Sequence, residues 1–588
     1  MSHPLTHPVH SFHIPVMGTG FTVDTPLKVA RYGISSVVSL VDDLLLEQMR
    51  GLVCRREGRG FEAVPADAED ARADRITRYL DLLGELVDRQ IDQVRGAVFE
   101  KGSEINRYFE MLPGSPLRTA YERMQEATGP ARARLQEELR GAVVAGGIDV
   151  NIMTKLDRVR LHRGKPLGPA FTDAMSALRG YARSRLRSSV VLSAGVNRRL
   201  FGYLAEFDDF FPDGAGDMRK RIVLKVSDFR SAQVQARLLA QKGLWVSEFR
   251  VESGLNCGGH AFGGTGTLLG PVLEDFRRER ARLSAQLRES WVAALASLGR
   301  VVPEAPPAQR ITVQGGIGTA EENELLMSHY GVDGTGWGSP FLMVPEAVNI
   351  DSIHLERLCE AGEDDIRLSD SSPLGVPFWS LCNSESELER LRLIDEGHPG
   401  SACPKGFLVA DTEFTPVPIC TASRAYQRRK LKAISDAGLD AAESARQVGD
   451  VVVKACICHD LAGGATLPSG IDPDARTAVC CGPNTAYFTR PASLREMIDH
   501  IYGRGRLPLT EARPHMLLKE LSLHLDRLRA AATGRQDQGA EAAAKVRENL
   551  QAGIAQYREL AERTLAGARA SFLERLEHLQ SELMSHRS

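Results

Sequence analysis

Eight short apolar runs alternate with helical patterns over the first 344 residues, and this alternation leaves few folds open to the chain. The runs are rich in Val and Ile, and most end in polar or glycine-rich turns. Repeated units of this kind form a parallel sheet, because a crossover helix must carry the chain back to the start of the next strand. The runs are His13–Gly20, Ile34–Val41, Gly147–Thr154, Ser188–Gly195, Lys220–Asp228, Trp245–Gly254, Ile311–Gly318 and Val332–Phe341. They predict a (β/α)₈ TIM barrel with its chemistry in the turns after the strands.

The rest of the chain divides into three segments around this α/β barrel. The barrel takes residues 1–43 and 141–344, and residues 44–140, with helical spacing of Leu, Arg, Glu and Asp, form a long helical insertion after the second strand. Residues 345–508 are an irregular Cys-containing region, and residues 509–588 are a helical tail. The apolar stripe of the tail predicts packing on the barrel or on a second chain, with a solvated helix as the alternative.

Composition and charge exclude several classes of protein. The 588 residues include 73 Lys and Arg against 76 Asp and Glu, which is not the charge balance of a nucleic-acid-binding protein. The uncharged segment Gly254–Leu273 contains too many glycines for a membrane-spanning helix. The N-terminus has no basic region followed by an apolar run, so we expect a cytoplasmic protein. We also expect a small-molecule substrate, and neither a nucleic-acid nor a membrane partner.

Two glycine-rich turns follow the seventh and eighth runs. They read QGGIGT (Gln314–Thr319) and GTGWGSPF (Gly334–Phe341). Barrels commonly bind a phosphate with the backbone N–H groups of these two loops, and glycine lets the backbone approach the anion. The residues suited to this task are Gly315, Gly316, Gly338 and Ser339. The alternative is that the glycines only turn the chain.

Two further side chains point to chemistry at the same end of the barrel. His260 follows the sixth run in NCGGHAF, where an imidazole can reach a ligand and remove a proton from a weak carbon acid. The alternative is a packing role. Lys225 lies inside the fifth run, where an unpaired ammonium would be costly. It therefore faces an electron-rich ligand or pairs with a barrel Glu or Asp.

These motifs together resemble the flavin-dependent barrels of the nitronate monooxygenase (2-nitropropane dioxygenase) family, which are related to flavin-dependent enoyl-acyl-carrier-protein reductases. IPVMGTGF resembles the family's opening strand and turn, DVNIM its third strand, NCGGHAF its histidine motif, and QGGIGT and WGSPF its phosphate turns. The resemblance implies FMN, with His260 as the base. It places Met17, Gly18, Asn151 and Lys225 near the isoalloxazine ring and Gly315, Gly316, Gly338 and Ser339 on the phosphate.

The resemblance implies an FMN-dependent oxidoreductase that oxidises a small carbon acid or nitronate. One alternative is an enoyl or enone reductase working with NAD(P)H or with a carrier protein docked on the helical segments, which could also form a homo-oligomer. Asn256 stands where the family usually has an acidic residue, and Cys257 replaces a small one. These departures keep open a third alternative, an FMN barrel that serves as a scaffold in a biosynthetic complex.

Six of the ten cysteines lie between residues 403 and 481. In a reducing compartment, such clustering is associated with metal or redox chemistry. Thiolates from these loops could hold zinc or an iron–sulfur cluster, whereas ordinary buried thiols are the alternative. The six candidates are Cys403, Cys420, Cys456, Cys458, Cys480 and Cys481, and His459 beside them is expected to be structural.

Overall fold

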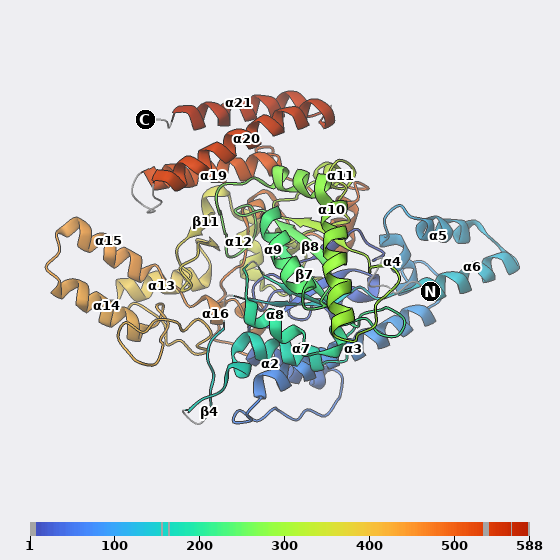
Figure 1. The fold of residues 1–588 in the computed structure, drawn as a ribbon, viewed down its shortest axis with the longest axis horizontal. Coiled ribbons are helices and arrows are strands. Elements are labelled where there is room, and N and C mark those ends of the chain that lie inside the picture. The colour runs from blue at the N-terminus through green and yellow to red at the C-terminus, as the bar shows by residue number, and fades with distance from the viewer. Residues whose placement is uncertain are drawn as a thin grey trace.

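Eight parallel strands form a closed barrel at the centre of the molecule (Figure 1). The structure is a computed structural model that describes residues 8–154, 157–162, 165–193, 195–532, 540–565 and 567–585. The strands follow one another around the barrel in the order β1-β10-β9-β8-β7-β6-β3-β2. They are β1 (Phe12–Ile14), β2 (Ser35–Ser39), β3 (Ile148–Ile152), β6 (Ser188–Leu192), β7 (Lys220–Val226), β8 (Val246–Glu252), β9 (Arg310–Gln314) and β10 (Gly334–Gly336).

Each strand coincides with one of the eight apolar runs, so the predicted (β/α)₈ barrel is confirmed. Closure depends on β1, in which Phe12 pairs with Thr335 of β10 and His13 with Ser35 of β2. Most buried Val and Ile side chains of the strands belong to the main hydrophobic core, and Val37, Val191 and Val223 form a small separate cluster. Consequently, the turns that carry the candidate site residues meet at one end of the barrel.

Helices surround the barrel and include part of the segment expected as an insertion. Helix α3 (Ala71–Gly96) packs against α2 (Asp43–Arg56) and α7 (Asp173–Arg183), and so belongs to the outer ring. Helices α4 (Glu104–Met111), α5 (Pro116–Glu126) and α6 (Gly129–Ala142) have a separate small core, and α5 and α6 lie to one side of the barrel in Figure 1. The other outer helices are α1 (Thr25–Val29), α8 (Arg198–Leu204), α9 (Phe229–Ala240), α10 (Leu269–Ser297) and α11 (Ala320–Ser328).

The C-terminal region is bound to the barrel through backbone hydrogen bonds. Gly20 N donates to Leu461 O at 3.0 Å, and Gly259 N donates to Cys481 O at 3.1 Å. The region contains α12 (Ser352–Glu360), β11 (Ile366–Ser369), β12 (Phe378–Leu381), α13 (Glu385–Asp395), α14 (Arg424–Asp436), α15 (Ala441–Val452), α16 (Ile457–Asp460), α17 (Gly463–Thr466) and α18 (Leu494–Ile501). Both bonds join turns that follow barrel strands, so this region covers the end of the barrel that carries the candidate site.

The tail folds into three helices that pack on the barrel. They are α19 (Met516–Ala532), α20 (Ala540–Thr564) and α21 (Arg569–Ser585), which lie together along one side of the molecule in Figure 1. Tyr557 is fully buried, and its hydroxyl accepts a hydrogen bond from Gly270 N at the start of α10, at 3.3 Å. The apolar stripe of the tail therefore packs on the same chain. Within the described residues, no helix is long and apolar enough to cross a membrane.

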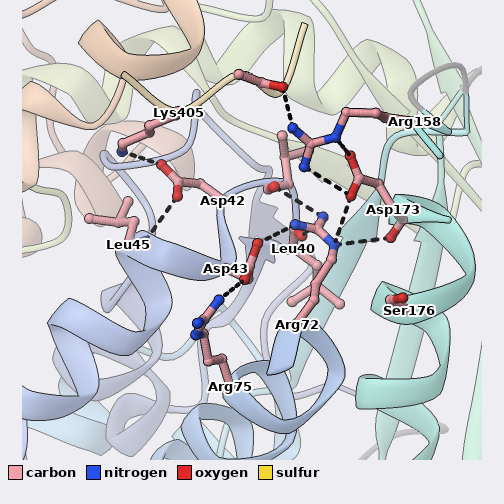
Figure 2. Close-up of polar contacts among 12 residues, drawn as sticks. Leu40, Asp42, Asp43, Leu45, Arg72, Arg75, Arg158, Asp173, Ser176 and Lys405 are labelled. Carbon is pink, nitrogen blue, oxygen red and sulfur yellow. Dashed lines mark hydrogen bonds and ion pairs between the residues drawn. The ribbon is translucent and has the colours of Figure 1, made fainter. Parts of the chain in front are cut away.

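A buried network of charges joins β2, α3, α7 and the C-terminal region (Figure 2). Arg72 of α3 pairs with Asp43 at the start of α2, and its guanidinium donates to the carbonyl oxygens of Leu40 and Val41 at 2.9 and 3.0 Å. Asp173 at the start of α7 lies 3.1 Å from Arg158. Three helix or strand ends are thereby held at one point beside the barrel mouth.

Candidate functional site

A cavity of about 290 Å³ opens at the carboxyl ends of the barrel strands. Its walls come from the turns after β1, β8, β9 and β10 and from side chains of β2, β3, β6 and β7. All nine residues assigned to the flavin and the base line this one cavity: Met17, Gly18, Asn151, Lys225, His260, Gly315, Gly316, Gly338 and Ser339. The structure thus brings together residues that are spread over more than 300 positions of the sequence.

His260 is held by a segment that sequence reasoning did not connect with it. Its Nε2 lies 2.7 Å from Ser372 Oγ, and its ring packs edge-on against Phe378 with 5.0 Å between the ring centroids. The backbone on either side is paired with the C-terminal region, since Trp379 N donates to Gly259 O. A hydroxyl can donate to a neutral imidazole or accept from a protonated one, so this contact allows both states of His260.

Lys225 pairs with a barrel carboxylate and also lines the cavity. Its Nζ lies 2.9 Å from Glu252 Oε2. Burial lowers the pKa of Lys225, but the charge and hydrogen bond of Glu252 outweigh burial, so that its pKa is raised and the ammonium is maintained. Both roles considered for Lys225 are therefore compatible. Glu252 was missed from the sequence, although a charged residue in a buried run is a signal that could have identified it.

Two buried amide oxygens at the cavity have no hydrogen-bond partner among the described residues. They are Asn151 Oδ1 and Gln314 Oε1, although the side chain of Gln314 does donate to Glu252 at 2.6 Å. The two residues are 5% and 7% exposed. Because buried polar atoms are nearly always hydrogen-bonded, these two are suited to donors on a ligand. A flavin ring, which has an N–H donor among its polar edge atoms, fits this requirement.

The glycine turns combine a structural and a ligand-facing role. Gly316 has φ +76°, and a Cβ atom there would overlap the side chain of Asn256, so glycine is required for packing. Gly338 is different, because a Cβ atom there would meet nothing closer than Pro15 Cγ at 3.4 Å. Its backbone borders the cavity beside Ser339, which suits the approach of a phosphate.

Asn256 and Cys257, the two unusual residues beside His260, have separate roles. Asn256 is buried and donates from Nδ2 to Met516 O at the start of α19, at 3.1 Å. It fastens the tail to the loop after β8 that carries His260, and it does not line the cavity. Cys257 does line the cavity, and burial raises the pKa of its thiol well above the usual value, so the thiol stays protonated.

Residues of the C-terminal region form the cover of the cavity. Most of them are apolar, and they shield the interior of the cavity from water. The cover comprises Leu374, Val376, Phe378, Leu408, Ile457, Cys458, Leu461, Cys480 and Asn484. None of these was predicted as a site residue except the two cysteines, which were considered as metal ligands.

The six cysteines do not form one set. Cys480 and Cys481 follow one another beside the His260 loop, where burial raises the pKa of Cys480 to about 11. Cys403, Cys420, Cys456 and Cys458 influence one another's pKa elsewhere in the C-terminal region. Among the described residues, no group of three or more His, Cys, Asp or Glu side chains is arranged to hold a single metal ion. His459 is 2.8 Å from Asp460, an ion-pair geometry that agrees with the structural role expected for it.

Glu520 of α19 is buried against the end of β8, and we expect it to make stability depend on pH. It accepts hydrogen bonds from Ser253 Oγ at 2.6 Å and Leu269 N at 2.7 Å. Burial raises its pKa from 4.5 to about 7. Its contribution to stability is full below the unfolded pKa of 4.5 and is lost as the pH rises through the folded pKa of about 7. The loss amounts to about 3 kcal/mol at most.

The Glu520→Gln variant tests this assignment because its amide imitates the protonated acid. Urea unfolding at about pH 4.5 and about pH 8 should show that the wild type loses more stability than the variant on going to the higher pH. Glu541→Gln, a change at an exposed position of the tail, serves as the control and should match the wild type. If the free energy of unfolding changed equally with pH in the wild type and in Glu520→Gln, Glu520 would be ionised in the folded protein over this pH range.

Comparison with known proteins gives a likeness to solved structures. No family model matches the chain, and no curated protein matches it. Among solved structures, the chain is similar to that of nitroalkane oxidase from Streptomyces ansochromogenes, with a TM-score of 0.35 and 12% sequence identity, over 84% of this chain and 96% of that chain. At this identity the likeness concerns the fold, which the strand order of the chain itself establishes.

Proposed function

We propose that the chain is an FMN-dependent oxidoreductase that acts on a small carbon acid, such as a nitroalkane or its nitronate anion, with His260 as the base. The observation that carries this proposal is the convergence of all nine candidate residues on one cavity. Two buried amide oxygens in its wall lack a partner within the described chain and would suit donors on a flavin ring. When bound, FMN would supply the electron-accepting chemistry.

The residues of the cavity divide between two ends of such a cofactor. Met17, Gly18, Asn151 and Lys225 would hold the ring system, and the turns after β9 and β10 would hold the phosphate. An ammonium group has three donors, of which Glu252 takes one from Lys225. Lys225 is therefore suited to hydrogen-bond an electron-rich atom of a cofactor or substrate.

His260 would take up the proton of the substrate, with Ser372 as its hydrogen-bond partner. A neutral imidazole would take the proton from the carbon beside the nitro group, and Ser372 would accept a hydrogen bond from the imidazolium that results. Phe378 fixes the ring from one side, so the imidazole is oriented before a substrate arrives. The apolar cover would keep water from competing for the same proton.

Three measurements on the purified full-length protein test the proposal. The first is a visible absorption spectrum with identification of the flavin released by acid, which should give FMN. The second is oxygen consumption with a nitronate, which should exceed the rate without substrate. The third is flavin reduction by NAD(P)H.

The outcomes separate three functions. Flavin reduction by NAD(P)H without nitronate turnover would favour an enoyl or enone reductase. FMN binding with neither activity would favour a scaffold. Protein that takes up no FMN would disprove all three.

The Gly338→Asp variant should bind FMN about 100-fold more weakly, since it places a carboxylate where the phosphate would bind and like charges in close contact cost several kcal/mol. Gly338→Ala is the matched control, because its methyl group finds ordinary contact distances and its backbone has φ −94°. Titrating the apoprotein with FMN by flavin fluorescence gives both dissociation constants. Equal FMN affinities for the two variants would show that the phosphate does not bind at this turn.

A further inference from the structure

The turn after β9 is bound by side chains from the cover and from the tail. Its residues Gly315, Gly316 and Ile317 line the cavity. Arg513, which lies just before α19, donates from Nη2 to Gly316 O at 2.9 Å. Asn484 of the cover donates from Nδ2 to Ile317 O, also at 2.9 Å. Two successive carbonyl oxygens of the turn are therefore held by residues that follow it by 197 and 167 positions.

The guanidinium of Arg513 is itself fixed by buried partners. It donates from Nη1 and Nη2 to the two carboxylate oxygens of Glu322 in α11, at 2.9 and 2.7 Å. The side chains of Arg513 and Glu322 are 7% and 3% exposed. The Nε of Arg513 donates to Asn484 Oδ1 at 3.0 Å. Because a two-bond pairing with a carboxylate fixes the plane of a guanidinium, Arg513 meets the turn in one defined orientation.

Gly318, the third glycine of QGGIGT, leaves room for this arginine. A Cβ atom at Gly318 would lie 2.5 Å from Nη2 of Arg513, which is closer than a side chain can approach. The N–H of Gly318 donates to Glu322 Oε2 at 2.9 Å. Glu322 Oε1 accepts a further bond from Met516 N, at the start of α19, at 2.7 Å. One side of the turn is thus built around the tail, and the other borders the cavity.

The bond to Gly316 O sets the direction of the next backbone N–H. The C=O and N–H groups of a trans peptide point in opposite directions, so holding Gly316 O turns the N–H of Ile317 away from Arg513. Backbone N–H groups of glycine-rich turns are donors to phosphates. We propose that Arg513 is a positioning residue, which orients this N–H to bind the phosphate group of the cofactor.

Arg513 acts through the turn, and not as a ligand of the phosphate. It does not line the cavity, and the carboxylate of Glu322 balances its charge. The tail thereby becomes part of the phosphate site, although its helices lie outside the barrel. This inference rests on the proposed function, because it requires a cofactor that carries a phosphate.

The test compares FMN with riboflavin, which has the same ring system but no phosphate. Arg513→Met alone would leave the carboxylate of Glu322 buried without its cation, so the variant to use is the double change Arg513→Met with Glu322→Gln. Titration of the full-length apoprotein by flavin fluorescence gives both dissociation constants. The double variant should bind FMN about tenfold more weakly than the wild type, which is the usual effect of losing one hydrogen bond. Its affinity for riboflavin should be unchanged.

Two controls isolate Arg513. Glu322→Gln keeps the arginine on Gly316 O, and Arg563→Met removes an arginine of α20 that is 69% exposed, so both should bind FMN as the wild type does. Far-UV circular dichroism checks that each variant is folded. An equal loss of affinity for FMN and riboflavin, or the same loss in Glu322→Gln, would overturn the positioning role. So would unchanged FMN affinity in the double variant, whereas wild-type protein that binds neither flavin would contradict the proposed function and this inference with it.

Discussion

His260→Ala is expected to bind FMN as the wild type does and to turn over neutral nitroalkanes about 10²–10⁴-fold more slowly, which is the usual contribution of a positioned general base. The imidazole is the side chain of the cavity best suited to act as a base, and its partner Ser372, at 2.7 Å, can serve both of its protonation states. Removing it leaves in place the residues that are proposed to hold the flavin ring and the phosphate.

The choice of substrate separates a base from a residue that merely shapes the cavity. A nitronate prepared in advance has already lost the proton, so its oxidation should be slowed far less by His260→Ala than that of the nitroalkane. His398→Ala, which removes an exposed histidine, is the control and should leave both rates unchanged. If His260→Ala slowed both substrates equally, proton removal by His260 would be ruled out.

Arg72→Met is expected to lower the free energy of unfolding by about 3–5 kcal/mol, the usual cost of removing one partner from a buried ion pair. The side chains of Arg72 and Asp43 are 4% and 5% exposed. Burial raises the pKa of Asp43, but Arg72 and Arg75 outweigh burial and hold it below its usual value. Without Arg72, the carboxylate keeps one partner, and the carbonyl oxygens of Leu40 and Val41 lose their donor.

The control for this variant comes from the same helix. Arg89 of α3 pairs with Glu57 at the surface, where ion pairs contribute about 0–1 kcal/mol, so Arg89→Met should change stability little. Denaturant unfolding of the two variants gives the comparison. Because the pKa of Asp43 is lowered, its contribution is present above the unfolded pKa and is lost as the pH falls. The difference in unfolding free energy between wild type and Arg72→Met should therefore become smaller in acid. If Arg72→Met lost no more stability than Arg89→Met, the structural role of Arg72 would be contradicted.

The barrel could be predicted from sequence because its signal is local. Each strand is a short apolar run followed by a polar turn, so eight runs could be counted without knowing which strands pair. The same count placed His260 and the glycine turns at the cavity. Lys225 was assigned two alternatives because burial alone does not reveal a partner, and Glu252 was found only once β7 and β8 were in register.

The cover could not be predicted, because no local pattern shows which loops meet. His260 and Ser372 are separated by 112 residues, and neither sequence context indicates the other. Asn256 looked like an altered catalytic position, yet it binds the backbone of Met516 in the tail. Likewise, six clustered cysteines could not be divided into a group of four and a separate pair before the chain was folded.

The pairing of Phe12 with Thr335 sets the order of events on the ribosome. At about 5–20 residues per second, β1 waits roughly 15–65 s for the strand that closes the barrel. During that time the nascent sheet has two open edges, and open edges of this kind are templates for aggregation. The cavity is covered later still, once Cys480 and Asn484 have emerged, so it is enclosed only near the end of synthesis.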